Sequence, residues 1–315
     1  MEFKHEPIML EECIENLNIK ADGIYVDGTL GGAGHSSKII EKLSSNGLLI
    51  GIDRDQEALA ASRERLKAYN NVKYVWGNHE QIKQHVENLQ IEKVDGILLD
   101  LGISSYQIDE VTRGFSYTKN AKLDMRMNQE QSLTAEEVVN HYSEEELVNI
   151  FFEYGEEKFS RRIAERIVKE RTQKRIETTY ELADIIRASV PKDAIDSFKR
   201  VFQALRIEVN GELKDLKQAI RDSVEILNDG GRICVITFHS LEDRIIKNTF
   251  VELEGKCTCP KDFPICVCGV KSFGKVITRK PIIPSNEEQE RNPRSRSAKL
   301  RVFERGVFLD ASSGL

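Results

Sequence analysis

The chain has 315 residues, of which 40% are hydrophobic and 31% are charged, and its formal net charge is −6. This length and composition predict a globular protein with a sizeable core, arranged as one large domain or two. The sequence has no apolar run of about eighteen residues and no apolar signal core near residue 1, so it supports neither a membrane span nor secretion. We expect a cytoplasmic protein.

A glycine-rich turn follows the first expected strand. The strand ends at Tyr25-Val26, residues 27–35 contain four glycines, and a helix is expected from Ser36. Glycines let the backbone approach a ligand and adopt positive φ angles. A second strand ends on Asp53, a carboxylate in position to bind ribose. Together these features predict a Rossmann-like nucleoside site, with a plain glycine turn and a solvated Asp53 as the alternative.

The glycine spacing disfavours a dinucleotide cofactor. Ser37 occupies the position that the G-x-G-x-x-G pattern fills with glycine for close approach to a pyrophosphate. S-adenosylmethionine (AdoMet) needs a carboxylate for its ribose but has no pyrophosphate, so it fits the pattern better.

Short apolar runs at residues 48–52, 72–76, 94–99 and 232–238 alternate with helical patterns. This alternation predicts an α/β fold with a buried parallel sheet. A helix is expected over residues 212–227, a chain turn at Gly230-Gly231, and a final antiparallel pair at residues 273–278 and 299–303. The polar residues 286–297 are expected to form a mobile loop.

Between Tyr106 and about Asn210 no strand-like run occurs, and helix starts accumulate. Thr134, Ser143 and Thr178 are each followed three residues later by Glu, the spacing of a capping box. A crossover between two strands of one sheet needs only one helix, so this block predicts an inserted helical domain. We expect it to cover the substrate.

Two segments are strongly basic although the whole chain is acidic. Residues 158–175 carry eight basic and two acidic side chains, and residues 271–301 carry nine and three. In the first segment, Ile163 and Ile167 mark an inward helix face, while Arg162, Arg166 and Lys169 recur on another. Such segments contact an RNA backbone or form solvated charged faces.

Four of the six cysteines lie close together, as two C-x-C pairs. Four thiolates suit a structural zinc ion, although C-x-x-C is the usual pairing. Unmetallated thiols in a loop are the alternative, because a reducing cytoplasm disfavours disulfides. The candidate ligands are Cys257, Cys259, Cys266 and Cys268. Cys234 lies within an apolar strand and is expected to pack there.

The sequence resembles the bacterial small-subunit ribosomal RNA (cytosine-N4) methyltransferases over nearly its whole length. Six motifs in order carry this resemblance, and they are DGT at 27–29 with GHS at 34–36, DLGISS at 100–105 with Gln107, RGFS at 113–116 with LDMRM at 123–127, FQALRI at 202–207 with NGEL at 210–213, FHSLEDR at 238–244 and NPRSRS at 292–297.

The resemblance implies a class I (Rossmann-like) AdoMet-dependent methyltransferase domain, residues 1–110 and 211–315, with an inserted all-helical substrate-recognition domain, residues 111–210. Its target would be the N4 amino group of a cytidine in the decoding (P-site) region of 16S rRNA, cytidine 1402, within the small ribosomal subunit. The cofactor contacts that carry over are Ala33, Gly34, His35, Asp53, His79, Asp100 and Gln107. His79 departs from the aromatic residue that is common in the family.

Asp100 is the expected catalytic residue. The exocyclic amine of cytosine is a poor nucleophile because its lone pair is delocalised into the ring, so acceptors aimed at its hydrogens would favour transfer. Asp100 ends an apolar strand at the edge where open α/β folds bind ligands. We expect it to orient the amine or the cofactor in a near-attack geometry, without a general base. The alternative is an Asp that caps a turn.

A base buried in folded RNA must be turned out of its stack, and aromatic and cationic side chains commonly receive it. At least one of the three candidate rings is expected to pack in the core instead, and a lone His such as His239 is more often structural. Asp124 with Arg126 could hold the loop or contact the nucleotide. The expected substrate contacts are Tyr106, Arg113, Phe115, Tyr117, Asp124, Arg126, Arg206, Asn210, His239, Ser240, Asp243 and Arg244.

Three other functions stay open on the sequence. The first is an RNA-binding protein on a methyltransferase scaffold, against which the set Asp27, Gly34, Asp53 and Asp100 argues. The second is a small-molecule methyltransferase, which would have little need for two basic segments. The third is a nicotinamide dehydrogenase, which the glycine spacing disfavours. The sequence does not indicate an oligomeric state.

Overall fold

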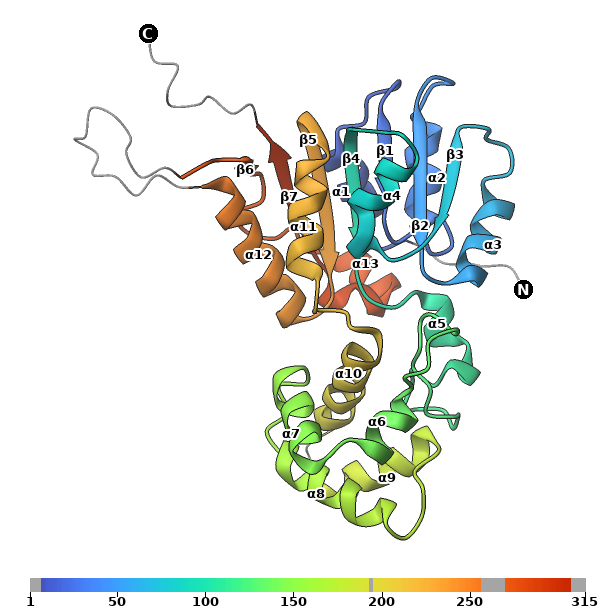
Figure 1. Ribbon diagram of the computed structural model, residues 1–315, viewed down its shortest axis with the longest axis vertical. Helices are drawn as coiled ribbons and strands as arrows, with labels where there is room; N and C mark the ends of the chain where they lie inside the picture. The colour runs from blue at the N-terminus through green and yellow to red at the C-terminus, as the bar shows by residue number, and fades with distance from the viewer. Residues whose placement is uncertain (1–6, 193–194, 256–269, 307–315) are drawn as a thin grey trace, which may run out of the picture. The chain divides into compact units, whose positions relative to one another are not determined.

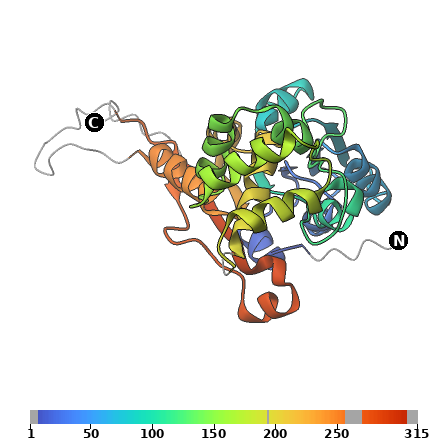
Figure 2. The same ribbon diagram turned by 90° about the horizontal axis from the view of Figure 1, so that it is seen from below.

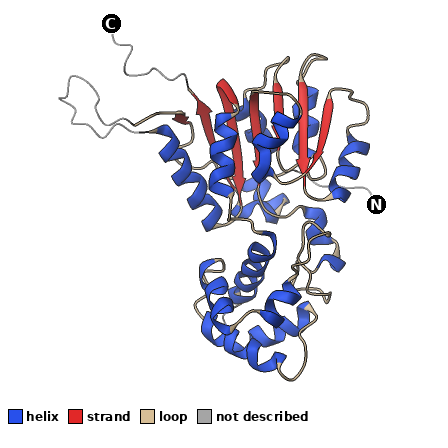
Figure 3. Ribbon diagram, in the orientation of Figure 1, coloured by secondary structure: helices blue, strands red, loops and turns tan. Residues whose placement is uncertain are grey.

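The computed structural model describes residues 7–192, 195–255 and 270–306. The chain divides into two compact units, Met1–Gly102 with Asp215–Leu315, called here the sheet unit, and Ile103–Lys214, called the helical unit. In the described chain, every named strand belongs to the sheet unit (Figure 3). We expected the changeovers at residues 110/111 and 210/211, whereas the compact units change at 102/103 and 214/215.

The sheet unit contains a seven-stranded sheet with the order β3-β2-β1-β4-β5-β7-β6 (Figure 1). Strands β1 to β5 run parallel to their neighbours among themselves, and β7 is antiparallel to β5 and β6. The predicted α/β class and the antiparallel final pair are confirmed. The strands are β1 (Ile24–Asp27), β2 (Leu48–Asp53), β3 (Val72–Trp76), β4 (Val94–Asp100), β5 (Leu227–Thr237), β6 (Gly274–Val276) and β7 (Lys299–Arg305).

Helices cover both faces of this sheet, as its apolar central strands require. On one face, α1, α2 and α3 contribute Leu17, Ile39 and Leu59 to an apolar cluster. On the other, α11 packs against α4 and α12 (Figure 1). Across the described ranges, we find no helix with the length and apolarity needed to cross a membrane. The helices are α1 (Leu10–Leu17), α2 (Gly34–Glu41), α3 (Gln56–Arg65), η1 (His79–Gln81), α4 (Ile82–Asn88), α11 (Leu216–Glu225) and α12 (Ser240–Glu254).

Two expectations for the C-terminal part were wrong. Gly230-Gly231 does not end an element but lies inside β5, where the pairing with β4 shifts register and Gly230 has a φ of 77°. Residues 286–297 form α13 (Asn286–Arg291) and η3 (Pro293–Ser297) instead of a mobile loop. The Ser285 side chain caps α13 by accepting from the Glu288 N–H, a local signal that the polar composition hid.

Helix α13 is tied to the start of α1, which lies beside it in Figure 2. The buried Glu288 carboxylate accepts a hydrogen bond of 2.8 Å from the Met9 N–H. Met9 has a left-handed φ of 55° and is fully buried. A second contact, between His35 Nε2 and the Ile8 carbonyl oxygen, holds the same residues close to the glycine turn.

The helical unit has its own apolar core, which includes Phe151, Ile163 and Leu205. The predicted N-caps Thr134, Ser143 and Thr178 are confirmed, and the last two form complete capping boxes. In α8, Ile163 and Ile167 are buried while Arg162 is exposed, as the helical spacing of apolar and basic residues in this segment predicts. The helices are α5 (Ser105–Asp109), η2 (Val111–Arg113), α6 (Ala135–His141), α7 (Glu144–Glu153), α8 (Ser160–Arg171), α9 (Thr179–Ser189) and α10 (Asp196–Asn210).

Candidate functional site

Polar side chains gather at the carboxyl ends of the parallel strands. Asp27 ends β1, Asp53 ends β2, Asp100 ends β4, His79 follows β3 and His239 follows β5. Carboxyl ends of parallel strands meet at one edge of a sheet, where open α/β folds bind ligands. The sheet unit therefore brings together, at one edge, residues that are far apart in the sequence.

The glycine turn lies between β1 and α2 at this edge. Ala33 caps α2 in the left-handed conformation, with a φ of 57°, and is fully buried. Gly31 also has a positive φ, of 49°. At Gly34 a Cβ atom would lie 2.8 Å from Pro7 Cγ, so the close packing of residue 7 on the turn requires glycine there.

Asp53 holds the glycine turn from the neighbouring strand. Its Oδ2 accepts a hydrogen bond of 2.7 Å from Gly31 N–H, and its Oδ1 accepts one of 2.8 Å from Asp55 N–H. Burial raises the pKa of this carboxyl, and the two backbone donors oppose that shift. Each carboxylate oxygen can accept more than one hydrogen bond, so Asp53 can still receive the hydroxyls of a ribose.

Asp27 is a buried carboxylate that joins β1 to the first turn of α2. Its Oδ2 accepts from Ser36 Oγ at 2.7 Å, and its Oδ1 accepts from Thr29 N–H at 3.2 Å. Burial raises the pKa of Asp27 to about 6. The residue therefore positions the glycine turn and also adds negative charge to the edge.

Asp100 is the most electrostatically perturbed acid of the edge. Its backbone N–H donates to Thr29 Oγ1 at 2.6 Å, which ties β4 to the glycine turn. Its Oδ1 is buried and has no hydrogen-bond partner within the described ranges. Burial, followed by the charges of Asp27 and Glu242, raises the pKa of Asp100 to about 8. A half-buried acid whose buried oxygen is unsatisfied, at an edge where ligands bind, is typical of a functional group.

Two buried histidines flank the acids. His35 Nε2 lies 3.0 Å from the Ile8 carbonyl oxygen, and His35 Nδ1 lies 3.8 Å from Asp100 Oδ2. His79 Nε2 has no hydrogen-bond partner in the part of the chain that is described. Burial and the nearby Arg54 lower the pKa of His79 to about 3, so its ring is neutral. A neutral, flat ring can stack on a base.

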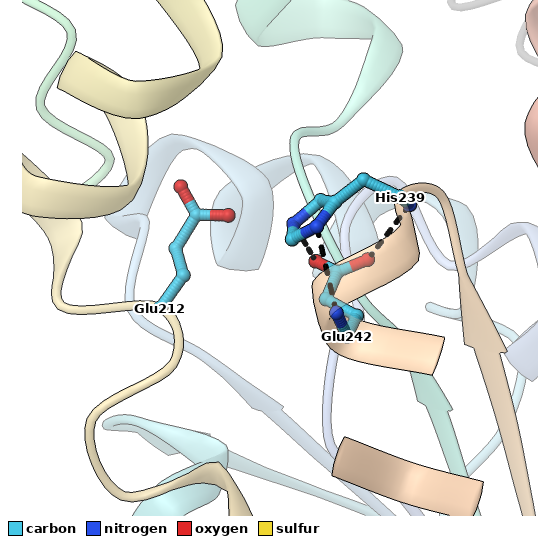
Figure 4. A group of neighbouring side chains, drawn as sticks. All are labelled: Glu212, His239 and Glu242. Atoms are coloured by element: carbon cyan, nitrogen blue, oxygen red, sulfur yellow. Dashed lines mark hydrogen bonds and ion pairs between the residues drawn. The ribbon is translucent and has the colours of Figure 1, made fainter. Parts of the chain in front are cut away.

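Glu242 belongs to this edge, and the sequence analysis missed it. Its Oε2 accepts from Phe238 N–H at 2.8 Å, and its Oε1 lies 3.0 Å from His239 Nε2 (Figure 4). His239 and Glu242 form a capping box at the start of α12. The H-x-x-E spacing was the available signal, but capping boxes usually begin with Ser or Thr. His239 is thus a partly buried capping residue.

The other expected substrate residues of the sheet unit lie on α12. Asp243 accepts two hydrogen bonds from Arg301 on β7, at 2.6 and 3.1 Å, and these fix α12 to the sheet. Ser240 is the first residue of α12 and is exposed, and Arg244 is exposed one turn later. Of the three substrate candidates on α12, Ser240 and Arg244 are the exposed ones.

Most polar candidates of the helical unit hold its loops. Arg126 makes a bidentate pair with Asp124 at 2.9 and 2.7 Å, and Arg206 makes one with Glu212 at 2.8 and 2.7 Å. Glu212 is the third residue labelled in Figure 4. The two other candidates bond mainly to backbone. Buried Arg113 donates to the carbonyls of residues 126 and 127, and Asn210 bonds to the backbone of residues 125, 127 and 206.

The aromatic candidates pack inside the helical unit. Phe115 and Tyr117 are partly buried against its apolar core, and the Tyr117 ring centroid lies 5.5 Å from that of Phe202. This confirms that at least one candidate ring has a packing role. The side chain of Tyr106 lies outside the described residues. Gln107 is buried, and its Oε1 accepts from Ser104 N–H at 3.2 Å.

The four clustered cysteines, Cys257, Cys259, Cys266 and Cys268, lie outside the described residues, so the predicted zinc site stays a prediction. Cys13 and Cys234 are free thiols buried in the apolar cluster of the sheet unit. This confirms that Cys234 packs within a strand.

The strand order, the antiparallel final pair and the glycine turn bonded to Asp53 define a class I, Rossmann-like methyltransferase. Residues 2–306 match the sequence profile of the MraW methylase family, and the chain belongs to this family. Two relatives named Ribosomal RNA small subunit methyltransferase H, from Clostridium botulinum strains Loch Maree and Kyoto, are each 60% identical to it over 305 residues, 96% of this chain and 99% of the relative.

Similarity to solved structures is weaker. The structure of a rRNA methylase from Streptococcus thermophilus aligns with a TM-score of 0.43 at 11% identity, covering 98% of this chain and 100% of that chain. Thermus thermophilus TrmN aligns with a TM-score of 0.42 at 10% identity, covering 94% of this chain and 48% of that chain.

Proposed function

We propose that the protein transfers the methyl group of AdoMet to the N4 amine of a cytidine in 16S rRNA, cytidine 1402 of the decoding region, within the small ribosomal subunit. The observation that carries this proposal is the 60% identity, over nearly full length, to proteins named Ribosomal RNA small subunit methyltransferase H. The edge of the sheet unit supports it, because Asp53 ends β2 and Asp100 ends β4, and both strands pair with β1 in one Rossmann-like sheet.

The residues at the edge fit AdoMet. Asp53 has acceptor capacity for ribose hydroxyls, and the neutral ring of His79 can stack on adenine. The buried Oδ1 of Asp100 lacks a partner among the residues that the structure describes. The glycine turn lets the backbone come close to the ligand. When bound, AdoMet supplies an electrophilic methyl group on a sulfonium.

In the proposed reaction, Asp100 orients the N4 amine of the cytidine, and the turn that follows Asp100 completes the site. A carboxylate oxygen that accepts from the N4 hydrogens localises the amine lone pair, and the donor is then held in line with it. The methylated amine becomes acidic, so its proton leaves without a strong base. Asp27 and Thr29 act indirectly. Asp27 accepts a hydrogen bond from the Thr29 N–H, and the Thr29 hydroxyl accepts one from the Asp100 N–H, so the two residues hold the glycine turn against Asp100.

The rRNA substrate needs basic surface for its phosphates. On α8 of the helical unit, Arg161, Arg162 and Lys169 are exposed. In the sheet unit, Arg294 and Arg296 of η3 are exposed, and η3 leads into β7 beside the end of β5. The second pair therefore lies at the same sheet edge as Asp100. We infer that both surfaces contact rRNA backbone.

One assay separates the candidate functions. The protein is incubated with methyl-labelled AdoMet and, in parallel, small ribosomal subunits, naked 16S rRNA or a metabolite extract, and the label is then located. We expect N4-methylcytidine in small-subunit rRNA. Label in a metabolite would indicate a small-molecule methyltransferase, and RNA binding without transfer would indicate a binding protein.

Replacing Arg296 tests the basic edge of the sheet unit. We expect Arg296→Ala to weaken binding to small-subunit rRNA and to reduce the slope of log affinity against log salt by about 1, the effect of losing one phosphate contact. Filter binding at several salt concentrations measures this. The matched control is Lys67→Ala, an exposed cation between α3 and β3 at the opposite sheet edge. Equal slopes for both variants would contradict the assignment.

A further inference from the structure

Asp100 Oδ2 lies 3.8 Å from Nδ1 of His35, whose ring is buried, while the Asp100 side chain is half-buried. A carbonyl oxygen can only accept, so the 3.0 Å contact of His35 Nε2 with the Ile8 carbonyl places a hydrogen on Nε2. In the neutral ring Nδ1 then carries a lone pair, and it lies 3.8 Å from Asp100 Oδ2. An ionised Asp100 beside a neutral His35 would bring two acceptors face to face.

The surroundings of Asp100 oppose a further negative charge. Asp27 approaches from β1, Glu242 from α12 and His35 from α2, and the nearby Cys13 thiol of α1 stays neutral because burial raises its pKa. Two of these groups are acids. Arg301, a cation of β7, is paired with Asp243 of α12. Burial together with these acids raises the pKa of Asp100 to about 8, which favours a protonated carboxyl at neutral pH.

We propose that Asp100 lets the site distinguish the cationic methyl donor from the neutral thioether product: it holds a proton in the ligand-free protein and releases it to solvent when a sulfonium binds. This inference rests on the proposed function. The proton passes from the carboxyl to a buffer base, and the carboxylate that remains is neutralised by the sulfonium. S-adenosylhomocysteine carries no sulfonium, so it leaves Asp100 protonated and is held less tightly.

Calorimetry of the wild-type chain tests this directly. Binding of AdoMet and of S-adenosylhomocysteine is measured at pH 7 in phosphate and in Tris, whose ionisation enthalpies differ. We expect release of close to one proton with AdoMet and almost none with S-adenosylhomocysteine. By linkage, AdoMet affinity should rise about tenfold per pH unit below pH 8, whereas product affinity should stay nearly flat. Both ligands carry the same α-amino group, so its titration cancels in the comparison.

Asp100→Asn removes the titrating group with little change in shape. We expect this variant to bind AdoMet about tenfold more weakly at pH 8, to release no proton and to bind S-adenosylhomocysteine within about threefold of wild type. Retained product binding shows that the variant is folded, and the wild-type buffer comparison stands without it. The matched control is Asp22→Asn, an exposed acid of the same unit, which should keep the proton release.

The outcomes separate this inference from the proposed function. Equal proton release with both ligands would assign the effect to their shared α-ammonium and overturn the discrimination. Binding of AdoMet without proton release would overturn the inference alone. Absence of binding by either ligand would instead overturn the proposed function.

Discussion

Asp100→Ala is expected to slow methyl transfer to small-subunit rRNA by about 100-fold or more in a single turnover, a typical loss for one acceptor or donor aimed at a reacting group. The buried Oδ1 of Asp100 has no hydrogen-bond partner among the described residues, and its backbone is fixed by Thr29. A preorganised oxygen at this place can orient the amine without reorganisation. Rapid quenching at saturating AdoMet measures the chemical step apart from binding.

Two controls bear on this result. Asp22→Ala removes an exposed acid of the same unit and should transfer methyl at the wild-type rate. Asp53→Ala should weaken AdoMet binding and recover part of its rate at high AdoMet concentration, because the role proposed for Asp53 is to bind the ribose. A single-turnover rate for Asp100→Ala equal to that of wild type would refute the catalytic role of Asp100.

The sheet and its ligand-binding edge could be predicted because their signals are local. Apolar runs that end on Asp53 and Asp100 indicate buried strands, and a strand-end acid must lie at the carboxyl edge of a parallel sheet. The N-caps Ser143 and Thr178 were equally local, since each bonds to a backbone group three residues away.

The partners of side chains could not be predicted in the same way. The sequence left two roles open for Arg126, holding the loop with Asp124 or contacting the nucleotide, and its guanidinium is bound to Asp124 and to two backbone carbonyls. Tyr117 stands in a polar motif, yet it packs on Phe202, which lies far along the chain. A sequence shows which groups can form hydrogen bonds or packing contacts, but not which residue far along the chain will be their partner in the fold.

Glu242 illustrates the same limit at the site itself. Its position three residues after His239 has the spacing of a capping box, and the structure forms one there. Its effect on Asp100 depends on β4 and α12 meeting at one sheet edge, a tertiary fact that no local pattern contains. The electrostatics of the edge therefore needed the fold, although each residue type was visible in the sequence.

The free energy of unfolding is expected to fall as the pH rises from about 4 to about 8, through Asp100 and Asp27. Their pKa values are raised to about 8 and about 6 in the folded protein, against 3.8 as the reference value. The folded state therefore binds more protons than the unfolded state in this window, so this stabilisation is complete below pH 4 and is lost as the pH passes the folded values. Urea unfolding followed by circular dichroism between pH 5 and 9 measures the slope.

Asp100→Asn isolates the contribution of one carboxyl to that slope. An amide resembles the protonated acid, so the variant and the wild type should be similarly stable at pH 5. At pH 9 the variant should be more stable by about 4 kcal/mol, because it has no buried charge to form. Asp22→Asn, which changes an exposed acid, should give a curve parallel to wild type. Parallel curves for Asp100→Asn and wild type would mean that Asp100 is ionised in the folded protein throughout, and the proton assigned to it would then be wrong.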